Sequence, residues 1–320
     1  MSMSPIVPST AAVSATARGD DAPRSRAGLF MPFLSDLITL TKPRITVMVV
    51  ATMLGGMWVA SRFFRAAGGE IPSPGLLVLA LLGTAMVVSG ANTLNMYIER
   101  DTDRLMDRTK ARPLPAQRLA PEMALGLGLA LSVISVPLLW FGVNPVTGAL
   151  AAVALLSYVL VYTPLKRRTW LALPIGAVPG AIPPLLGWTA VTGRVDVPGF
   201  LLFSVLFLWQ IPHFLAIATF RREDYRRAGM MVLPVEKGDR TTRIHIVAHT
   251  AVLVVTTALL VPFGVGGPVY LGAALVLGGA FFALGAAGLR ASAGASWARR
   301  LFFGSMVYLV LLFAALMIGL

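Results

Sequence analysis

The sequence contains no cysteine, and only 13% of its 320 residues are charged. The absence of Cys excludes disulfide bonds, thiolate metal sites and a cysteine nucleophile. Because there are only three His and 14 acidic residues, few side chains remain that can bind a metal or transfer a proton. Any polar chemistry must therefore be concentrated in a small part of the chain.

Most of the sequence is apolar instead, with 57% hydrophobic residues and a mean hydropathy of +0.78. Uninterrupted apolar runs of about 18 or more residues are typical of helices that span a bilayer. The sequence therefore predicts an all-α integral membrane protein, a bundle of nine transmembrane helices. The predicted spans are roughly residues 45–61, 76–97, 123–141, 146–163, 171–191, 198–219, 246–263, 269–289 and 301–320.

The net charge of +13 is explained better by membrane topology than by nucleic-acid binding. Alternate connections between the predicted spans hold 24 of the 27 Lys and Arg residues. By the positive-inside rule, the N-terminus and the loops after spans 2, 4, 6 and 8 are expected in the cytoplasm. The C-terminus is then expected outside, and we expect no nucleic-acid partner.

Residues 1–28 are rich in Ser, Ala and Pro and lack the apolar core of a signal peptide. They predict a disordered cytoplasmic tail, and residues 29–320 form the nine-span domain. The stretch 29–44 could lie along the membrane surface as an amphipathic helix. Two Asp and only three Arg make the tail a poor organelle-targeting segment, which favours the bacterial inner membrane over the mitochondrial one.

Four oxygen-bearing side chains recur every four residues after span 2: Asn95, Glu99, Asp103 and Asp107. If the span continues as a helix, they lie on one face. Acids at this spacing repel one another, so a cation should accompany them. Oxygen ligands of these types suit Mg²⁺. The alternative is a solvated helix end with ordinary ion pairs.

Basic residues follow these acids directly, in "RTKARPLP" at 108–115. Acids that hold a metal, followed by bases such as Lys110 and Arg112, describe a site for a metal-bound phosphate. A positive-inside membrane anchor is the alternative. In "YTPLKRRT" at 162–169, Lys166 and Arg168 could likewise contact a phosphate or extend to lipid headgroups.

Span 6 contains the unusual run "LWQIPHFLAIATF" at 208–220. Polar residues at membrane depth normally face a protein interior or a cavity. His213 could therefore bind a metal, transfer a proton or hydrogen-bond Gln210, although a satisfied structural histidine is the alternative. Trp209 and Phe214 are either packing residues or aromatic faces that stabilise a transient cation.

These segments together carry a resemblance to a known family. The pattern Asn95-x3-Glu99-x3-Asp103, with "RTKARPLP" after it, resembles the first acidic motif of UbiA-type intramembrane prenyltransferases. The segments "YTPLKRRT", "GAIPPLLGW", "WQIPHF" and "DYRRAGMMVLPV" look like those of the branch that farnesylates haem. The similarity runs from about Leu40 to the C-terminus, with the motifs in the same order.

The resemblance implies a bundle with a central cavity, capped by the two charged loops at 98–121 and 220–243 and open laterally to lipid. It implies transfer of a farnesyl group from farnesyl diphosphate to a vinyl group of haem b, with addition of water, to give haem O. Haem b is then a substrate rather than a permanent cofactor. The product could pass to a downstream haem-modifying enzyme.

The resemblance also assigns residues to roles in this reaction. One or two Mg²⁺ ions would be held by Asn95, Glu99 and Asp103, with Asp224 acting from the second loop. The four-residue spacing, rather than the resemblance, adds Asp107 as a further ligand. The diphosphate would be bound by four bases: Lys110, Arg112, Lys166 and Arg168. The haem and cation pocket would contain Trp209, His213 and Phe214, where His213 could orient the haem or bind its iron.

Two alternatives remain open at this point: a prenyltransferase acting on an aromatic quinone precursor, and a membrane transporter. Glu99 stands where many relatives have Asp, and the second loop offers adjacent Glu223 and Asp224 rather than a spaced acidic pair. The histidine in span 6 and the "MMVLPV" loop favour the haem branch. A transporter is disfavoured because the acids gather at the membrane edge and nine spans divide poorly into two repeats.

Overall fold

The computed structural model describes residues 26–69, 72–290 and 293–319, and the described chain is helical with no strand. Nine helical segments in it are long and apolar enough to cross a membrane. They are α2 (Pro43–Ala66), α3 (Pro74–Asp103), α4 (Pro121–Gly142), the continuous segment Pro145–Leu165, α7 (Ala172–Thr192), α8 (Val197–Phe220), α11 (Gly238–Leu259), the segment Pro268–Leu289 and α13 (Ala295–Ile318). The predicted nine-helix membrane bundle is confirmed. The cytoplasmic placement of the N-terminus stays a prediction.

Two of these segments contain a change of helix type. The fourth runs from α5 (Pro145–Leu156) through a π-helical turn, η1 (Ser157–Tyr162), into α6 (Thr163–Leu165). The eighth consists of α12 (Pro268–Ala286) followed by a 3₁₀ turn, η2 (Ala287–Leu289). Such π-helical turns inside α-helices occur frequently at functional sites.

Proline and short polar caps set the starts of several spans. Six of them have Pro in the first two positions, where its missing N–H leaves no hydrogen bond unmade. Ser73 caps α3, Asn144 caps α5 and Asp196 caps α8, each by accepting a hydrogen bond from a backbone N–H three residues later. The observed spans extend beyond several predicted apolar runs because helical hydrogen bonding continues into polar sequence.

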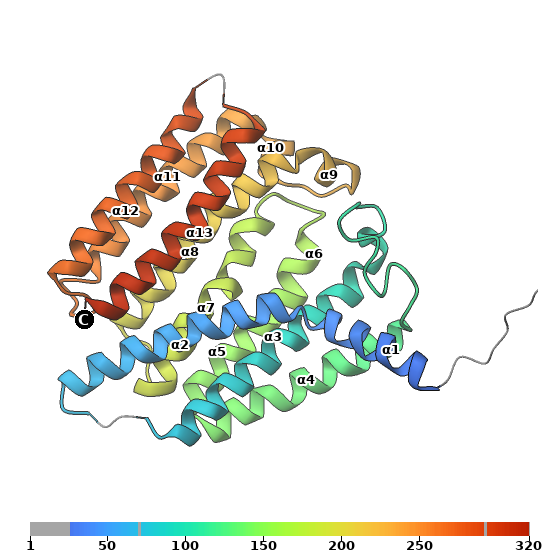
Figure 1. Cartoon of the computed structure of the whole chain (residues 1–320), viewed down its shortest axis with the longest axis horizontal. Helices are drawn as coiled ribbons and strands as arrows, with labels where there is room; N and C mark the ends of the chain where they lie inside the picture. Colours follow the sequence, from blue (N-terminus) through green and yellow to red (C-terminus); the bar gives the residue numbers. More distant parts are fainter. Residues whose placement is uncertain (1–25, 70–71, 291–292, 320) are drawn as a thin grey trace, which may run out of the picture.

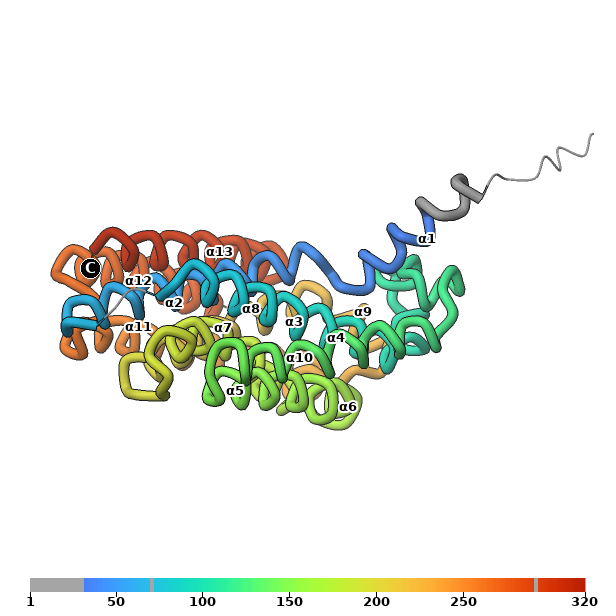
Figure 2. The backbone as a smooth tube through the Cα atoms, turned by 90° about the horizontal axis from the view of Figure 1, so that it is seen from below, coloured from blue at the N-terminus to red at the C-terminus, as the bar shows by residue number. Residues whose placement is uncertain are grey.

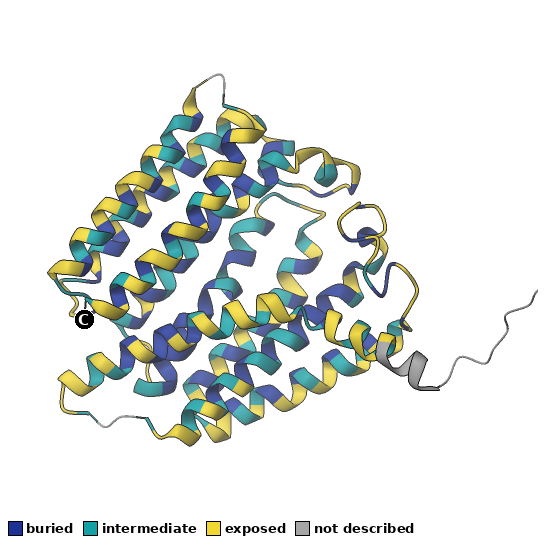
Figure 3. Ribbon diagram, viewed as in Figure 1, coloured by how far each residue is buried: buried dark blue, intermediate teal, exposed yellow. Residues whose placement is uncertain are grey.

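The helix α7 lies at the centre of the bundle, between the group α2 to α5 and the group α8, α11, α12 and α13 (Figure 1). In α7, 72% of the apolar window is buried, against 28–56% in the other spans. The dark ribbon of α7 in Figure 3 shows the same difference. The motif "GAIPPLLGW" is therefore the core of the fold rather than a surface segment.

Two glycines of this motif allow neighbouring helices to approach α7 closely. A Cβ on Gly187 would lie 2.1 Å from the carbonyl oxygen of Met53 on α2. A Cβ on Gly180 would lie 2.2 Å from Oε1 of Gln210 on α8. Because small residues let backbones pack tightly in membranes, these positions fix α2 and α8 against α7.

The segments outside the spans are short helices and turns. The helix α1 (Arg26–Leu40) precedes α2, so residues 26–28 of the predicted tail are helical and residues 1–25 lie outside the described residues. Figure 2 shows α1 projecting from the end of the bundle. The turns at 104–120, with α9 (Arg222–Arg227) and α10 (Leu233–Glu236), lie at that same end, away from the C-terminus (Figure 1).

Candidate functional site

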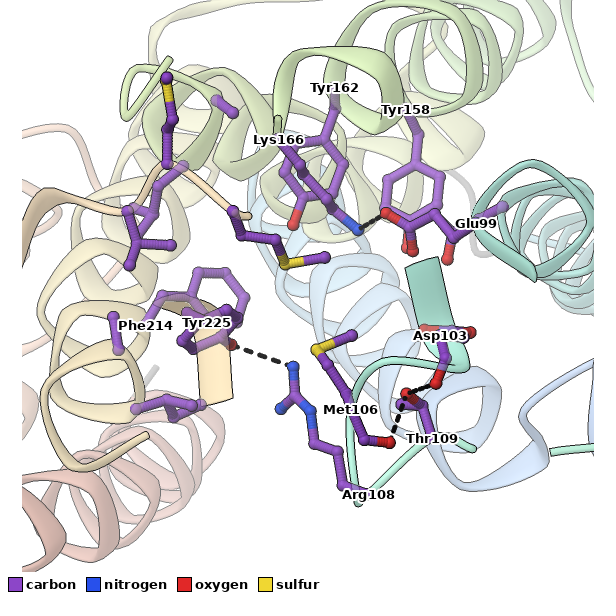
Figure 4. A pocket seen from close by; sticks show the side chains of 18 of the residues that line it. Glu99, Asp103, Met106, Arg108, Thr109, Tyr158, Tyr162, Lys166, Phe214 and Tyr225 are labelled. Atoms are coloured by element: carbon purple, nitrogen blue, oxygen red, sulfur yellow. Dashed lines mark hydrogen bonds and ion pairs between the residues drawn. The ribbon is translucent and has the colours of Figure 1, made fainter. Parts of the chain in front are cut away.

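A cavity of about 180 Å³ opens between the two charged loops at this end of the bundle. Its walls come from α3, η1, α7, α8 and α9, from the junction between α1 and α2, and from the turns that follow α3, α6 and α9 (Figure 4). Acidic, basic and tyrosine side chains meet in it beside apolar residues, among them Leu173, Phe214 and Ile217. One end of the cavity is therefore polar and charged, while other walls are apolar.

The helix α3 supplies the acidic side of the cavity. Asn95, Glu99 and Asp103 all line it, and they are 1%, 9% and 1% exposed. Their spacing of four residues places them on one face because α3 remains helical as far as Asp103. The hydroxyl of Thr109 donates to the Asp103 carbonyl oxygen at 2.8 Å and closes the end of the helix.

The predicted ladder does not continue to the fourth residue. The helix α3 ends at Asp103, so the prediction that Asp107 lies on the same face is wrong. Asp107 is exposed and pairs with Lys110 at 2.8 Å and with Arg227 at 3.3 Å. Both Asp107 and Lys110 therefore lie outside the cavity lining.

Both carboxylates of the ladder already have basic partners. Nζ of Lys166 lies 2.8 Å from Oε1 of Glu99, and the guanidinium of Arg112 lies 2.7 Å from Oδ2 of Asp103. Lys166 follows α6 and Arg112 lies in the first charged loop, so the fold brings three separate segments to one point. These are two of the four bases that the sequence assigns to a diphosphate.

The amide of Asn95 is held in one orientation by a small hydrogen-bond network. Its Nδ2 donates to Oγ1 of Thr163 at 3.1 Å, and Thr163 in turn donates to the Tyr158 carbonyl oxygen at 2.8 Å. The remaining oxygen, Oδ1, accepts a hydrogen bond from Nζ of Lys42 at 3.1 Å. The network therefore directs Oδ1 of Asn95 toward Lys42, a base of the cavity lining.

Lys42 is a cavity residue that the sequence did not single out. It lies between α1 and α2, and its side chain joins the bases Arg112 and Lys166 in the cavity lining. Burial lowers the pKa of the Lys42 ammonium to about 7, and the positive charges of Arg112 and Lys166 act in the same direction. In the sequence, Lys42 falls within the stretch 29–44, which is predicted only to lie along the membrane surface.

Two tyrosines from the π-helical turn form another wall that the sequence did not reveal. Tyr158 and Tyr162 line the cavity, their ring centroids lie 5.3 Å apart, and Nζ of Lys166 lies 4.4 Å from the Tyr162 centroid. Their spacing in "SYVLVY" equals that of the acidic ladder, which is the pattern that could have indicated them. They give the polar end two aromatic rings.

The two charged loops contact each other across the mouth of the cavity. Arg108 donates to the Tyr225 hydroxyl at 3.2 Å and lies 5.1 Å from the centre of its ring (Figure 4). Met106 and Met230 pack together in one apolar cluster beside this pair. The contacts close the cavity on the side of the loops.

Two further residues predicted for the site have other surroundings. Asp224 pairs with Arg227 at 2.7 Å and Arg221 at 3.4 Å, and Tyr225 rather than Asp224 lines the cavity. Arg168 is exposed and also lies outside the lining. A role for either residue would require the loops to rearrange.

Two of the three aromatic residues predicted on span 6 are turned away from the cavity. Trp209 donates to the Ser305 carbonyl oxygen on α13 at 2.7 Å, and Nδ1 of His213 lies 2.7 Å from Oγ of Ser305. The His213 ring stacks on Trp209 at 4.7 Å. Trp209 and His213 therefore lie outside the cavity lining, and their role toward the haem or the cation stays a prediction. Gln210 donates to the carbonyl oxygens of Ala177 and Leu206 rather than pairing with His213. Phe214 does line the cavity.

Residues 48–307 match the model of the UbiA prenyltransferase family, and the chain belongs to this family. It is 71% identical over 280 residues to the protoheme IX farnesyltransferase of Sorangium cellulosum, covering 85% of this chain and 100% of that protein. It is 49% identical over 292 residues to the protoheme IX farnesyltransferase of Myxococcus xanthus, covering 91% and 97%.

Solved structures share the fold. A digeranylgeranylglyceryl phosphate synthase superposes with a TM-score of 0.76 at 17% identity, covering 89% of this chain and 98% of that one. A UbiA homologue from Archaeoglobus fulgidus bound to GPP and Mg²⁺ superposes with a TM-score of 0.58 at 18% identity, covering 88% and 99%. At these identities the similarity establishes the helical architecture.

Proposed function

We propose that this protein transfers the farnesyl group of farnesyl diphosphate to a vinyl group of haem b, with addition of water, to give haem O. The observation that carries the proposal is a cavity in which paired acids and bases adjoin apolar walls. Its charged end suits a metal-bound diphosphate, and its apolar walls suit a prenyl chain. The 71% identity to a protein named protoheme IX farnesyltransferase supports haem as the acceptor.

The donor atoms on α3 fit a magnesium ion that arrives with its substrate. Mg²⁺ is usually bound by one or two carboxylates, with phosphate oxygens and water completing its coordination. Asn95, Glu99 and Asp103 offer an amide oxygen and two carboxylates on one face. In the described part of the chain, no group of three or more His, Cys, Asp or Glu could hold a metal without such help.

These residues would hold one Mg²⁺, which when bound would neutralise charge on the leaving diphosphate. A second ion would require Asp224 to leave Arg221 and Arg227. Asp107 is not among the ligands that we propose, because it lies outside the cavity lining.

The bases of the cavity would stabilise the leaving group. Arg112 and Lys166 lie at its charged end, where they can bind diphosphate oxygens as negative charge develops on them. The allylic carbon–oxygen bond breaks, and its electron pair leaves with the diphosphate. The rings of Tyr158 and Tyr162 can face the positive charge on the farnesyl carbon.

The haem vinyl group then supplies the electrons for the new carbon–carbon bond. Its π electron pair attacks the farnesyl carbon that carried the diphosphate. A water oxygen then adds to the vinyl carbon left with the positive charge, and this water releases one proton. The cavity of about 180 Å³ is smaller than the roughly 300–1,000 Å³ of ordinary ligand sites. The cavity must therefore widen to admit both substrates, and we propose that it does so where the loop contact Arg108–Tyr225 closes it.

The membrane placement follows from the charge distribution. Because the basic residues concentrate in alternate connections, we propose that the N-terminus and both charged loops face the cytoplasm and that the C-terminus lies outside. The named relatives are bacterial, which supports the inner membrane. We further propose that residues 29–320 form one catalytic domain after the N-terminal tail, and that a downstream haem-modifying enzyme takes the product.

The test is to express the chain in membranes that lack the activity and to supply haem b, farnesyl diphosphate and Mg²⁺. Extracted haem is analysed by mass, beside an Asp103→Asn variant and an exposed control, Arg44→Gln. A mass gain of farnesyl plus water is expected in the wild type and the control. It should fall about 100-fold in Asp103→Asn. Unchanged haem with folded wild-type protein would refute haem as the acceptor.

A further inference from the structure

The side chain of Lys42 enters the cavity from a backbone conformation that is unusual for lysine. Lys42 has φ 48° and ψ 62°, in the left-handed region, and it is followed by Pro43. A residue other than glycine rarely adopts this conformation, and a following proline restricts it further. Such strain persists where the surrounding structure enforces it, often at functional sites.

Three bases of the cavity each bind one of the three metal-ligand candidates on α3, while the remaining base, Arg108, binds the Tyr225 hydroxyl. Lys42 binds Asn95, just as Lys166 binds Glu99 and Arg112 binds Asp103. The bases come from the α1–α2 junction, the segment after α6 and the first charged loop, whereas all three acceptors lie on α3. Each oxygen ligand proposed for the metal is thus occupied by a different base.

This arrangement opposes the binding of a metal ion by itself. An ion that takes the three acceptors displaces three bases, which are then left near it without partners. A diphosphate alone would recruit the bases but leave Glu99 and Asp103 unpaired. When both arrive together, the metal takes the acceptors and the diphosphate takes the bases.

The charge balance also favours the joint complex. With Lys42, Arg108, Arg112 and Lys166 protonated, the four bases and the two carboxylates of the lining carry +2 in total. A prenyl diphosphate carries about −3 at neutral pH, so its complex with one Mg²⁺ carries about −1. The metal alone raises the charge of the site to +4, whereas the complex lowers it to about +1.

We propose that Lys42 is a diphosphate-binding residue that is held on Asn95 until metal and diphosphate bind as one unit. The inference rests on the proposed function, because it assigns Lys42 to the same donor substrate. On binding, Nζ of Lys42 leaves Oδ1 of Asn95 for the metal and contacts a diphosphate oxygen instead. No covalent bond changes in this exchange.

The test uses the full-length protein in detergent, with Mn²⁺ and inorganic pyrophosphate as probes. Calorimetry gives the affinity for Mn²⁺ alone and for preformed Mn²⁺–pyrophosphate, in the wild type and in Lys42→Met. The variant should bind Mn²⁺ alone at least 3-fold more tightly, since Asn95 is free. It should bind Mn²⁺–pyrophosphate about 10-fold more weakly, and Lys42→Arg should restore most of this affinity.

Arg44→Met is the matched control, because Arg44 is exposed, adjoins the same junction and lies outside the cavity lining. It should change neither affinity. If Lys42→Met weakens both ligands equally, or changes neither, the exchange is refuted. If the variant does not fold, the wild-type protein provides the test. At a fixed concentration of free Mn²⁺, saturating pyrophosphate should raise the amount of bound Mn²⁺ at least 10-fold. A smaller rise refutes the proposal.

The outcome is separable from that of the proposed function. If the wild-type protein shows the exchange but leaves haem unchanged, the role of Lys42 stands and the assignment of haem as the acceptor is refuted. If the wild-type protein farnesylates haem but Lys42→Met does not shift the two affinities in opposite directions, the proposed reaction stands and the exchange is refuted.

Discussion

The ion pair between Glu99 and Lys166 allows stability and catalysis to be separated by a double-mutant cycle. The atoms lie 2.8 Å apart, and the two side chains are only 11% and 18% exposed. Removing one partner of a buried pair costs about 3–5 kcal/mol, because the other charge is left uncompensated. With this residual exposure, we expect Lys166→Met to lower the free energy of unfolding by about 3 kcal/mol.

Removing both charges should restore most of the lost stability. The double variant Glu99→Gln/Lys166→Met is expected within about 1 kcal/mol of the wild type, because no unpaired charge remains. At about 2–4 °C per kcal/mol, Lys166→Met should melt about 6–12 °C lower, and the double variant only a few degrees lower. Thermal unfolding in detergent, followed by tryptophan fluorescence, measures both, with exposed Lys237→Met as control.

Catalysis should not recover with stability. Glu99 is a proposed metal ligand and Lys166 a proposed diphosphate ligand. The single variants Glu99→Gln and Lys166→Met and the double variant should therefore all farnesylate haem about 100-fold more slowly or worse. The assay is the mass analysis of extracted haem at a temperature where every variant is folded. Additive losses of stability in the double variant, or a double variant with wild-type activity, would refute this account of the pair.

Three further predictions follow from the fold and the site. Gly187→Leu should prevent folding, because a Cβ at this position would lie 2.1 Å from the carbonyl oxygen of Met53. Gly272→Leu should be tolerated, because a Cβ there would have no neighbouring atom within 4 Å, and size-exclusion chromatography compares the two variants. His213→Ala should cost about 1 kcal/mol through the lost Ser305 hydrogen bond but keep activity within 10-fold, and loss of haem turnover would contradict its placement. Chelation with EDTA should abolish turnover until Mg²⁺ is added, yet shift the melting temperature by less than about 2 °C, because the acids already have basic partners; a large shift would argue for a resident metal.

The sequence by itself determined the nine membrane helices and the acidic face of α3. Long apolar runs can satisfy their backbone groups in a bilayer only as helices or closed barrels, so length and composition suffice. The spacing of Asn95, Glu99 and Asp103 placed them on one face once the helix continued that far. Arg112 and Lys166 were identified by their charge and their nearness to the motifs.

Tertiary structure decided which other residues reach the cavity. An almost uniformly apolar helix such as α8 carries no pattern that fixes its rotation, so only packing on α13 turned Trp209 and His213 away. The end of α3 removed Asp107, because a turn after Asp103 redirects the chain. Lys42 entered the site through a strained junction far away in sequence, and such a contact exists only once helices α2 and α3 are packed.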